Sequence, residues 1–366
     1  MRAAWLAIVA ACGGGAALDA DAPMADAARD AAIDAPPPPD PWTAALGDLI
    51  PGVTLSDGWT DLRAMLPPMA ITGGWTDSLF ALPAGDELRF AYEQEDFFDF
   101  FIGAGAIDTG PILAGVTSDD FKMFDATLTD AGWVVSPDLV NSPDPALVEA
   151  SPATNASDDL YIFTRFDPTT GHSLLYSSQL VGGAWSAATE LPINAESCNN
   201  DNAKLVGELA TGVTIYFEST RGDDAGIGTT CGNRTLYYSS YANGAFTPVA
   251  QVPGIAEPTS DDSQPWLSAD LDTLYFTGVR DGAYGVFVAT RASPGDSFSN
   301  IHPVVQPTTV PSNYAGNDVF IGEASIVARP QGELLYLMCA IASNTHDGNT
   351  YGNADDITLV PCVARR

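Results

Sequence analysis

The chain has 366 residues, of which 47 are Asp or Glu and 14 are Lys or Arg, so its formal net charge is −33. This charge argues against nucleic-acid binding, because phosphate recognition needs clustered Lys and Arg. It also argues against docking on an anionic membrane, whereas cations, basic partners and neutral sugars are compatible with it. No apolar run approaches the roughly 20 residues needed to span a bilayer.

The first residues have the pattern of an export signal. Met1 and Arg2 form a short positive segment, residues 3–11 are apolar, and small residues precede Cys12. This order resembles a bacterial lipobox, which implies that residues 1–11 are removed and that Cys12 is lipidated. Residue 13 is Gly, so the Asp of inner-membrane retention is absent. We expect an exported outer-membrane lipoprotein, on the periplasmic or cell-surface side, that touches the membrane only through its lipid.

The lipidated cysteine begins a segment, residues 12–45, that predicts a disordered tether. It is rich in Ala, Asp and Pro, with four consecutive prolines at 36–39. Low hydrophobicity and proline prevent such a segment from building a core. We therefore assign the folded domain to residues 46–366.

An aromatic strand motif recurs five times in this domain, at residues 88–90, 160–163, 215–217, 274–276 and 335–337. A strand-like segment precedes each motif and further short ones follow, which predicts four strands per unit. β-Branched and aromatic residues dominate these segments, and no long window has a helical period. The pattern predicts an all-β repeat protein.

One unit carries a specific resemblance. Residues 267–291 read LSADLDTLYFTGVRDGAYGVFVATR, which resembles the WD40-like (PD40) repeat of TolB-type propellers. The likeness covers about residues 59–366 and is weakest in the first unit, where a long insertion ends at residue 120. It implies a β-propeller of five four-stranded blades, in which residues 59–65 supply the missing outer strand of the last blade. Six blades are the alternative, if residues 91–120 contain another.

Four cysteines remain besides Cys12, and they allow three pairings. Within the blade assignment, Cys198 and Cys231 lie in loops on one face of the propeller. Cys339 and Cys362 lie at the ends of adjacent strands. We predict the disulfides Cys198–Cys231 and Cys339–Cys362, and the absence of a CxxC spacing argues against metal binding by these cysteines.

Propeller ligands usually lie at the mouth of the central channel, where the inner strands begin. Each predicted inner strand starts with a polar residue, and these five are the candidate ligand-binding residues: Asp77, Glu149, Asn202, Gln264 and Glu323. We align the second and fifth blades on the tripeptide Glu-Ala-Ser, which recurs at 149 and 323. In the alternative interpretation these residues only hydrogen-bond to loop backbone.

The carboxylates Asp77, Glu149 and Glu323 are also the candidate catalytic residues. Five-bladed glycoside hydrolases place a carboxylic acid and a carboxylate base near this mouth. The analogy rests on the fold, because the surrounding motifs of those enzymes are absent here.

A loop in the last blade is rich in the oxygen ligands and glycines that suit Ca²⁺. Its candidate ligands are Asp347, Asn349, Asn353 and Asp355. A polar turn explains the same residues, and no other cofactor is expected.

Together these features predict a monomeric, non-enzymatic lipoprotein of the cell envelope. It would act as a binding or scaffold module for a protein or a glycan. The alternative is a glycoside hydrolase-like or carbohydrate-binding propeller that uses the carboxylates of the channel mouth.

Overall fold

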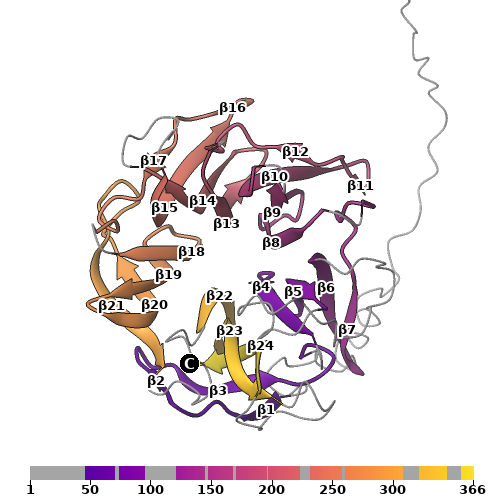
Figure 1. Ribbon diagram of the computed structural model, residues 1–366, viewed down its shortest axis with the longest axis vertical. Helices are drawn as coiled ribbons and strands as arrows, with labels where there is room; N and C mark the ends of the chain where they lie inside the picture. Colours follow the sequence, from indigo (N-terminus) through magenta and orange to yellow (C-terminus); the bar gives the residue numbers. More distant parts are fainter. Residues whose placement is uncertain are drawn as a thin grey trace, which may run out of the picture. The chain divides into compact units, whose positions relative to one another are not determined.

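Five antiparallel sheets are arranged in a ring around a central axis in the computed structural model of the protein (Figure 1). The structure describes residues 46–70, 74–94, 121–144, 147–167, 170–195, 197–222, 231–257, 260–307, 321–343 and 356–366. These residues belong to one unit, Pro39–Arg366, and their regular elements are all strands. None of them forms a helix that is long and apolar enough to cross a membrane. The export signal, Cys12, the tether and the Ca²⁺ candidates lie outside the described residues.

Each sheet is a blade whose strands run from the channel outwards. Blade 1 consists of β4 (Trp75–Ala81), β5 (Glu87–Glu93), β6 (Lys122–Thr129) and β7 (Gly132–Pro137). Blade 2 consists of β8 (Glu149–Thr154), β9 (Leu160–Asp167), β10 (His172–Val181), β11 (Ala184–Trp185) and β12 (Thr189–Glu190). Blade 3 consists of β13 (Asn200–Glu208), β14 (Gly212–Arg221), β15 (Cys231–Ala242), β16 (Ala245–Phe246) and β17 (Ala250–Gln251).

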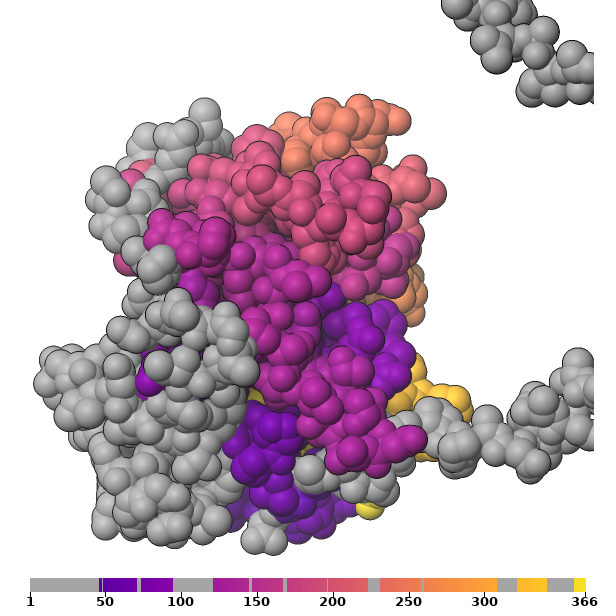
Figure 2. All heavy atoms as spheres, turned by 90° about the vertical axis from the view of Figure 1, so that its right-hand side faces the viewer, coloured from indigo at the N-terminus to yellow at the C-terminus, as the bar shows by residue number. Residues whose placement is uncertain are grey.

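The last two blades include strands from the beginning of the domain. Blade 4 consists of β18 (Asp261–Leu267), β19 (Thr273–Arg280), β20 (Ala283–Thr290), β21 (Ser299–Pro307) and β2 (Val53–Leu55). Blade 5 consists of β22 (Ile321–Arg329), β23 (Gly332–Ser343), β24 (Asp356–Arg365), β3 (Thr60–Met65) and β1 (Leu46–Leu49). In the side view, blade 2 faces the viewer in magenta (Figure 2).

The ring closes with five blades. The inner strands contact one another in the order β4, β8, β13, β18 and β22, and β22 returns to β4. Strand β3 pairs with β24, with Ala64 opposite Cys362. Strand β3 therefore supplies the fourth strand of the last blade, as predicted, and pairs with the outer edge of β24. The six-bladed alternative is wrong, because the contact between β22 and β4 leaves no gap for another blade.

Two-residue turns connect several of the hairpins. Asp281 and Gly282 join β19 to β20, and both have a positive φ, 52° and 75°. This is the backbone of a type I′ turn, whose twist matches that of the flanking strands. Asn243 and Gly244 form the equivalent turn in blade 3.

The hydrophobic core lies between the blades and is divided among their junctions. Phe276 and Phe287 pack against Tyr216 where blades 3 and 4 meet. Tyr336 and Val363 of blade 5 pack with Trp75 of blade 1 at the closing junction. Alternate residues of each middle strand face opposite neighbours, which explains why these strands are apolar on both faces.

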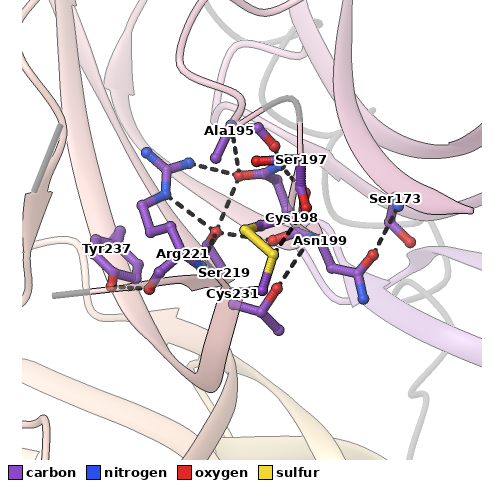
Figure 3. The surroundings of a disulfide bond; sticks show 11 residues. Ser173, Ala195, Ser197, Cys198, Asn199, Ser219, Arg221, Cys231 and Tyr237 are labelled. Atoms are coloured by element: carbon purple, nitrogen blue, oxygen red, sulfur yellow. Dashed lines mark hydrogen bonds between the residues drawn. A yellow bond between two sulfur atoms is a disulfide. The ribbon is translucent and has the colours of Figure 1, made fainter. Parts of the chain in front are cut away.

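Both predicted disulfides are confirmed. Cys198 and Cys231 are bonded with a Cα–Cα distance of 5.6 Å, and Cys339 and Cys362 with 6.1 Å. The first bond fastens the loop before β13 to the start of β15 (Figure 3). Beside it, Asn200 donates to the carbonyl oxygens of Ala195 and Cys198, which fixes the same loop.

Candidate functional site at the central channel

The five inner strands share one irregularity that shapes the channel. Each strand shifts register against its neighbour at the same place, which marks a β-bulge. The bulged residue has a positive φ in every blade, although none of the five is glycine: Ser78 (59°), Ser151 (53°), Asn202 (49°), Gln264 (52°) and Glu323 (60°). Non-glycine residues adopt this conformation only where the surrounding structure enforces it.

This ring of bulged residues includes three of the five predicted ligand-binding residues. Asn202, Gln264 and Glu323 are members, whereas Asp77 comes one residue before the bulge and Glu149 two residues before it. Ser78 and Ser151 hold the ring positions in blades 1 and 2, and sequence reasoning missed them. The Glu-Ala-Ser alignment was wrong, because Ser151, and not Glu149, is the structural counterpart of Glu323.

Hydrogen bonds join the inner strands into a closed circuit. Ser151 Oγ donates to Asp201 Oδ1 at 2.9 Å, so the 3.2 Å contact between Ser78 and Ser151 has Ser78 as its donor. The Asn202 amide and the Gln264 backbone N–H both donate to Glu218 Oε2, at 3.1 and 2.8 Å.

The other half of the circuit runs through Glu323. Gln264 Nε2 donates to Glu323 Oε1 at 3.0 Å, and the Leu79 N–H donates to Glu323 Oε2 at 3.1 Å. Because Leu79 follows Ser78, the circuit returns to its start. The bulges turn backbone N–H groups towards the next blade, and these bonds offset the backbone strain.

Asp77 and Glu323 form a coupled pair of carboxyl groups. Burial raises the pKa of Asp77, and burial together with the neighbouring Asp77 raises the pKa of Glu323. The two side chains share a hydrogen bond, which requires a proton on one of them. The pair connects the first and last blades at the channel.

Glu218 is a further acidic group beside the channel, and it was not predicted. Burial raises its pKa to about 7, although Arg234 lies 3.5 Å away and favours the ionised form. Its position opposite Asp201, on the second strand of blade 3, is set by strand pairing. No local sequence motif marks it.

Glu149 has a different environment from the other predicted residues. Its side chain is fully buried, with one oxygen 2.6 Å from Arg165 and the other 3.5 Å from Lys122. The Ser142 N–H donates to the same carboxylate at 2.7 Å. These contacts make Glu149 the centre of a buried ion-pair cluster that fastens β8 to β9 and to the start of β6.

Lys204 is the most unusual side chain in the channel. It starts from β13 of blade 3, yet its Nζ lies 4.2 Å from the ring centre of Phe80 in blade 1 and 5.4 Å from that of Trp266 in blade 4. The side chain therefore crosses the channel. It forms no ion pair with any described residue, and burial lowers its pKa to about 7.

Lys204 and the ring of bulged residues enclose a cavity of about 40 Å³ that all five inner strands line. Ligand pockets that enclose a small molecule measure roughly 300–1,000 Å³. The channel therefore has room for a few waters or one protruding chemical group. A whole sugar ring would have to rest outside this cavity.

Within the described residues, no group of three or more His, Cys, Asp or Glu side chains could hold a metal ion. The Ca²⁺ candidates Asp347, Asn349, Asn353 and Asp355 are outside that part of the chain. Calcium binding therefore stays a prediction.

The sequence matches no family model and no curated protein. A structural likeness exists to a protein of unknown function from Dyadobacter fermentans, at 10% identity over 86% of this chain and 100% of that chain, with a TM-score of 0.48. A GH43_1 enzyme from Xanthomonas citri is 12% identical over 81% and 88% of the chains, with a TM-score of 0.48. TolB from Acinetobacter baumannii is 12% identical over 80% and 54%, with a TM-score of 0.39.

The pairing of the strands, and not these similarities, establishes the fold. Without a matching family model, the WD40-like repeat stays a prediction, whereas the five-bladed propeller follows from the strand pairing itself. At such low identities and TM-scores, no activity or ligand passes from these proteins to this chain.

Proposed function

We propose that this protein is a non-catalytic, carbohydrate-binding propeller of the bacterial cell envelope, exported and anchored through a lipidated Cys12. The arrangement of Lys204 beside the half-buried ring of Trp266 at the channel carries the proposal. Aromatic rings stack on the apolar faces of sugars, and an ammonium group donates to sugar hydroxyls. The net charge of −33 favours a neutral glycan over an acidic one.

The size of the channel agrees with binding at its mouth. A hydroxyl-bearing group of the glycan fits the cavity of about 40 Å³, and the ring to which it is attached rests on Trp266. Lys204 is a donor to such a group in both of its protonation states. Asn202 and Gln264 line the same cavity and add amide groups.

The environments of the carboxyl groups argue against cleavage. Glycoside hydrolases separate their two carboxyl groups by about 5–5.5 Å or about 6.5–9.5 Å. Asp77 and Glu323 are hydrogen-bonded to each other, and Glu149 is engaged by Arg165 and Lys122. Because of these contacts, no two of the three predicted catalytic residues are placed as the acid and the base of a glycoside hydrolase.

Glycoside cleavage remains the second candidate because of Glu218. A carboxyl with a pKa of about 7 retains its proton in the range where a general acid must work. Loss of cleavage on Glu218→Gln and Glu323→Gln would support this candidate.

The proposal is tested by calorimetric titration of a protein of residues 41–366, which contains the whole folded domain, with neutral envelope and plant oligosaccharides. We expect Trp266→Ala and Lys204→Met each to weaken binding about tenfold, as the loss of one stacked ring or one buried donor predicts. Trp185→Ala is the matched control, because Trp185 lies in β11 on the outer edge of blade 2.

Unchanged affinity in Trp266→Ala and Lys204→Met, or release of shortened sugars by the wild-type protein, would refute non-catalytic binding at the channel. The anchor is tested separately by incorporation of a fatty-acid label, which Cys12→Ala should abolish.

A further inference from the structure

A second cavity, independent of the channel, lies between blades 2 and 3. Its volume is about 360 Å³, which is within the range of pockets that enclose small molecules. Leu160, Ile162 and Val213 form an apolar base, and Tyr241 and Phe246 provide an aromatic wall whose ring centres are 4.8 Å apart. The polar side chains of Ser177 and Gln179 also line it.

The cavity arises at one position of the repeat. In blade 3, Tyr216 of the second strand pairs with Tyr238 of the third. The equivalent pairs are Arg89 with Asp125 in blade 1, Tyr275 with Val288 in blade 4, and Tyr336 with Val363 in blade 5. Blade 2 has Ile162 paired with Ser177. It is the only one of the five pairs with neither an aromatic ring nor a guanidinium.

Large side chains occupy this position in the other junctions. Tyr216 stacks on Tyr238 with ring centres 5.7 Å apart, and its hydroxyl accepts a hydrogen bond from Arg291 of blade 4. The Tyr336 hydroxyl donates to the Gly85 carbonyl of blade 1. In the remaining junctions Arg89 reaches Asp158 of blade 2, and Tyr275 packs at the junction with blade 5.

We infer that the cavity between blades 2 and 3 binds an aromatic ring that carries a hydrogen-bonding group, such as a phenol. The ligand takes the place that a tyrosine side chain of the protein occupies in the neighbouring junction. The side chain of Gln179 forms no hydrogen bond with another described residue, so it can pair with the polar group of the ligand. The ring of the ligand packs on Tyr241 and Phe246.

The inference is tested by titrating the domain with phenol and with N-acetyltyrosinamide, observed by ligand-detected NMR. Cyclohexanol, similar in size but not aromatic, is the control ligand. We expect both aromatic probes to bind in roughly the millimolar range, as their few atoms allow, and cyclohexanol to bind at least tenfold more weakly. Tighter binding of the tyrosine derivative would identify a peptide side chain, and not a free phenol, as the source of the ring.

A matched pair of variants locates the binding. Ser177→Tyr places a ring at the position that Tyr238 occupies in blade 3 and should abolish binding of both probes, whereas Ser177→Ala keeps the cavity and should change affinity less than threefold. If Ser177→Tyr does not fold, Ser177→Leu fills part of the same space and should weaken binding at least fivefold. The inference is overturned if the wild-type protein binds neither probe, or if the filling variants bind as well as Ser177→Ala does.

Discussion

Two glutamates that begin the same tripeptide, Glu149 and Glu323, have different roles at the scale of single residues. Glu149 lies between two cations in the protein interior, whereas Glu323 shares a proton with Asp77 at the channel. The difference comes from the position of the bulge. In blade 2 the bulged residue is Ser151, two residues after Glu149, whereas in blade 5 it is Glu323 itself. A shift of two residues along a strand keeps the face but changes the neighbours.

The buried cluster around Glu149 leads to the first prediction. Glu149→Gln leaves Lys122 without its carboxylate, and Lys122 is itself buried. Breaking a buried ion pair in this way costs about 3–5 kcal/mol. We expect a loss of about 3 kcal/mol in the free energy of unfolding, measured with urea, and no change in glycan affinity.

Glu87→Gln is the control for this prediction, because Glu87 is exposed on β5. It should change the free energy of unfolding by less than about 0.5 kcal/mol. A loss below about 1 kcal/mol in Glu149→Gln would show that the cluster contributes little to stability.

At the scale of elements, the blades are fastened by different means. Blade 5 is completed by β3 from the other end of the domain, and Cys339–Cys362 joins its second and third strands. In blade 3, Cys198–Cys231 joins the loop before the inner strand to the third strand. Each disulfide therefore stabilises a single blade. The bonded cysteines are 33 residues apart in the sequence in blade 3 and 23 residues apart in blade 5.

The second prediction concerns Cys198–Cys231. By chain entropy, closing a loop of 33 residues stabilises the folded state by about 3–4 kcal/mol. The double variant Cys198→Ala/Cys231→Ala should lose that amount in urea unfolding under oxidising conditions. Addition of a reductant should destabilise this variant less than the wild-type protein, because the variant has only the Cys339–Cys362 disulfide left to reduce. An equal effect of the reductant on both proteins would contradict a stabilising role for this bond.

At the scale of the whole molecule, acidic groups accumulate around the channel of a protein that is already strongly negative. The pKa values of Asp77 and Glu323 are raised by burial, and that of Glu218 is raised to about 7. A carboxyl whose pKa is raised by folding binds its proton more tightly in the folded state. The contribution of these carboxyl groups to the free energy of unfolding is therefore fully present below their pKa in the unfolded chain, about 4. It is lost as the pH rises through their pKa in the folded protein.

The third prediction is that the thermal midpoint falls as the pH is raised from about 5 to about 7. Glu323→Gln should flatten this dependence, since the amide of Gln does not ionise. Glu218 contributes with the same sign, so part of the slope should remain. Above about pH 7 the lowered pKa of Lys204 acts in the opposite direction, which is why the measurement stays below that pH. An equal slope in Glu323→Gln would contradict the role of the shared proton.

The sequence by itself determined the all-β class, the five blades, the strand that closes the ring and both disulfides. These features follow from patterns that each repeat carries within its own strands and turns, such as the LYF strand and the Asp-Gly turn of residues 274–282. The sequence also located Asn202, Gln264 and Glu323 at the channel.

Only the tertiary structure decided which side chains meet across the blades. Lys204 contacts Phe80 of another blade, and Glu218 lies on a middle strand with no motif around it. The pairing of Ile162 with Ser177 becomes a cavity only because blade 3 stands opposite. Such contacts join residues far apart in the chain, so a pattern within a single repeat cannot specify them.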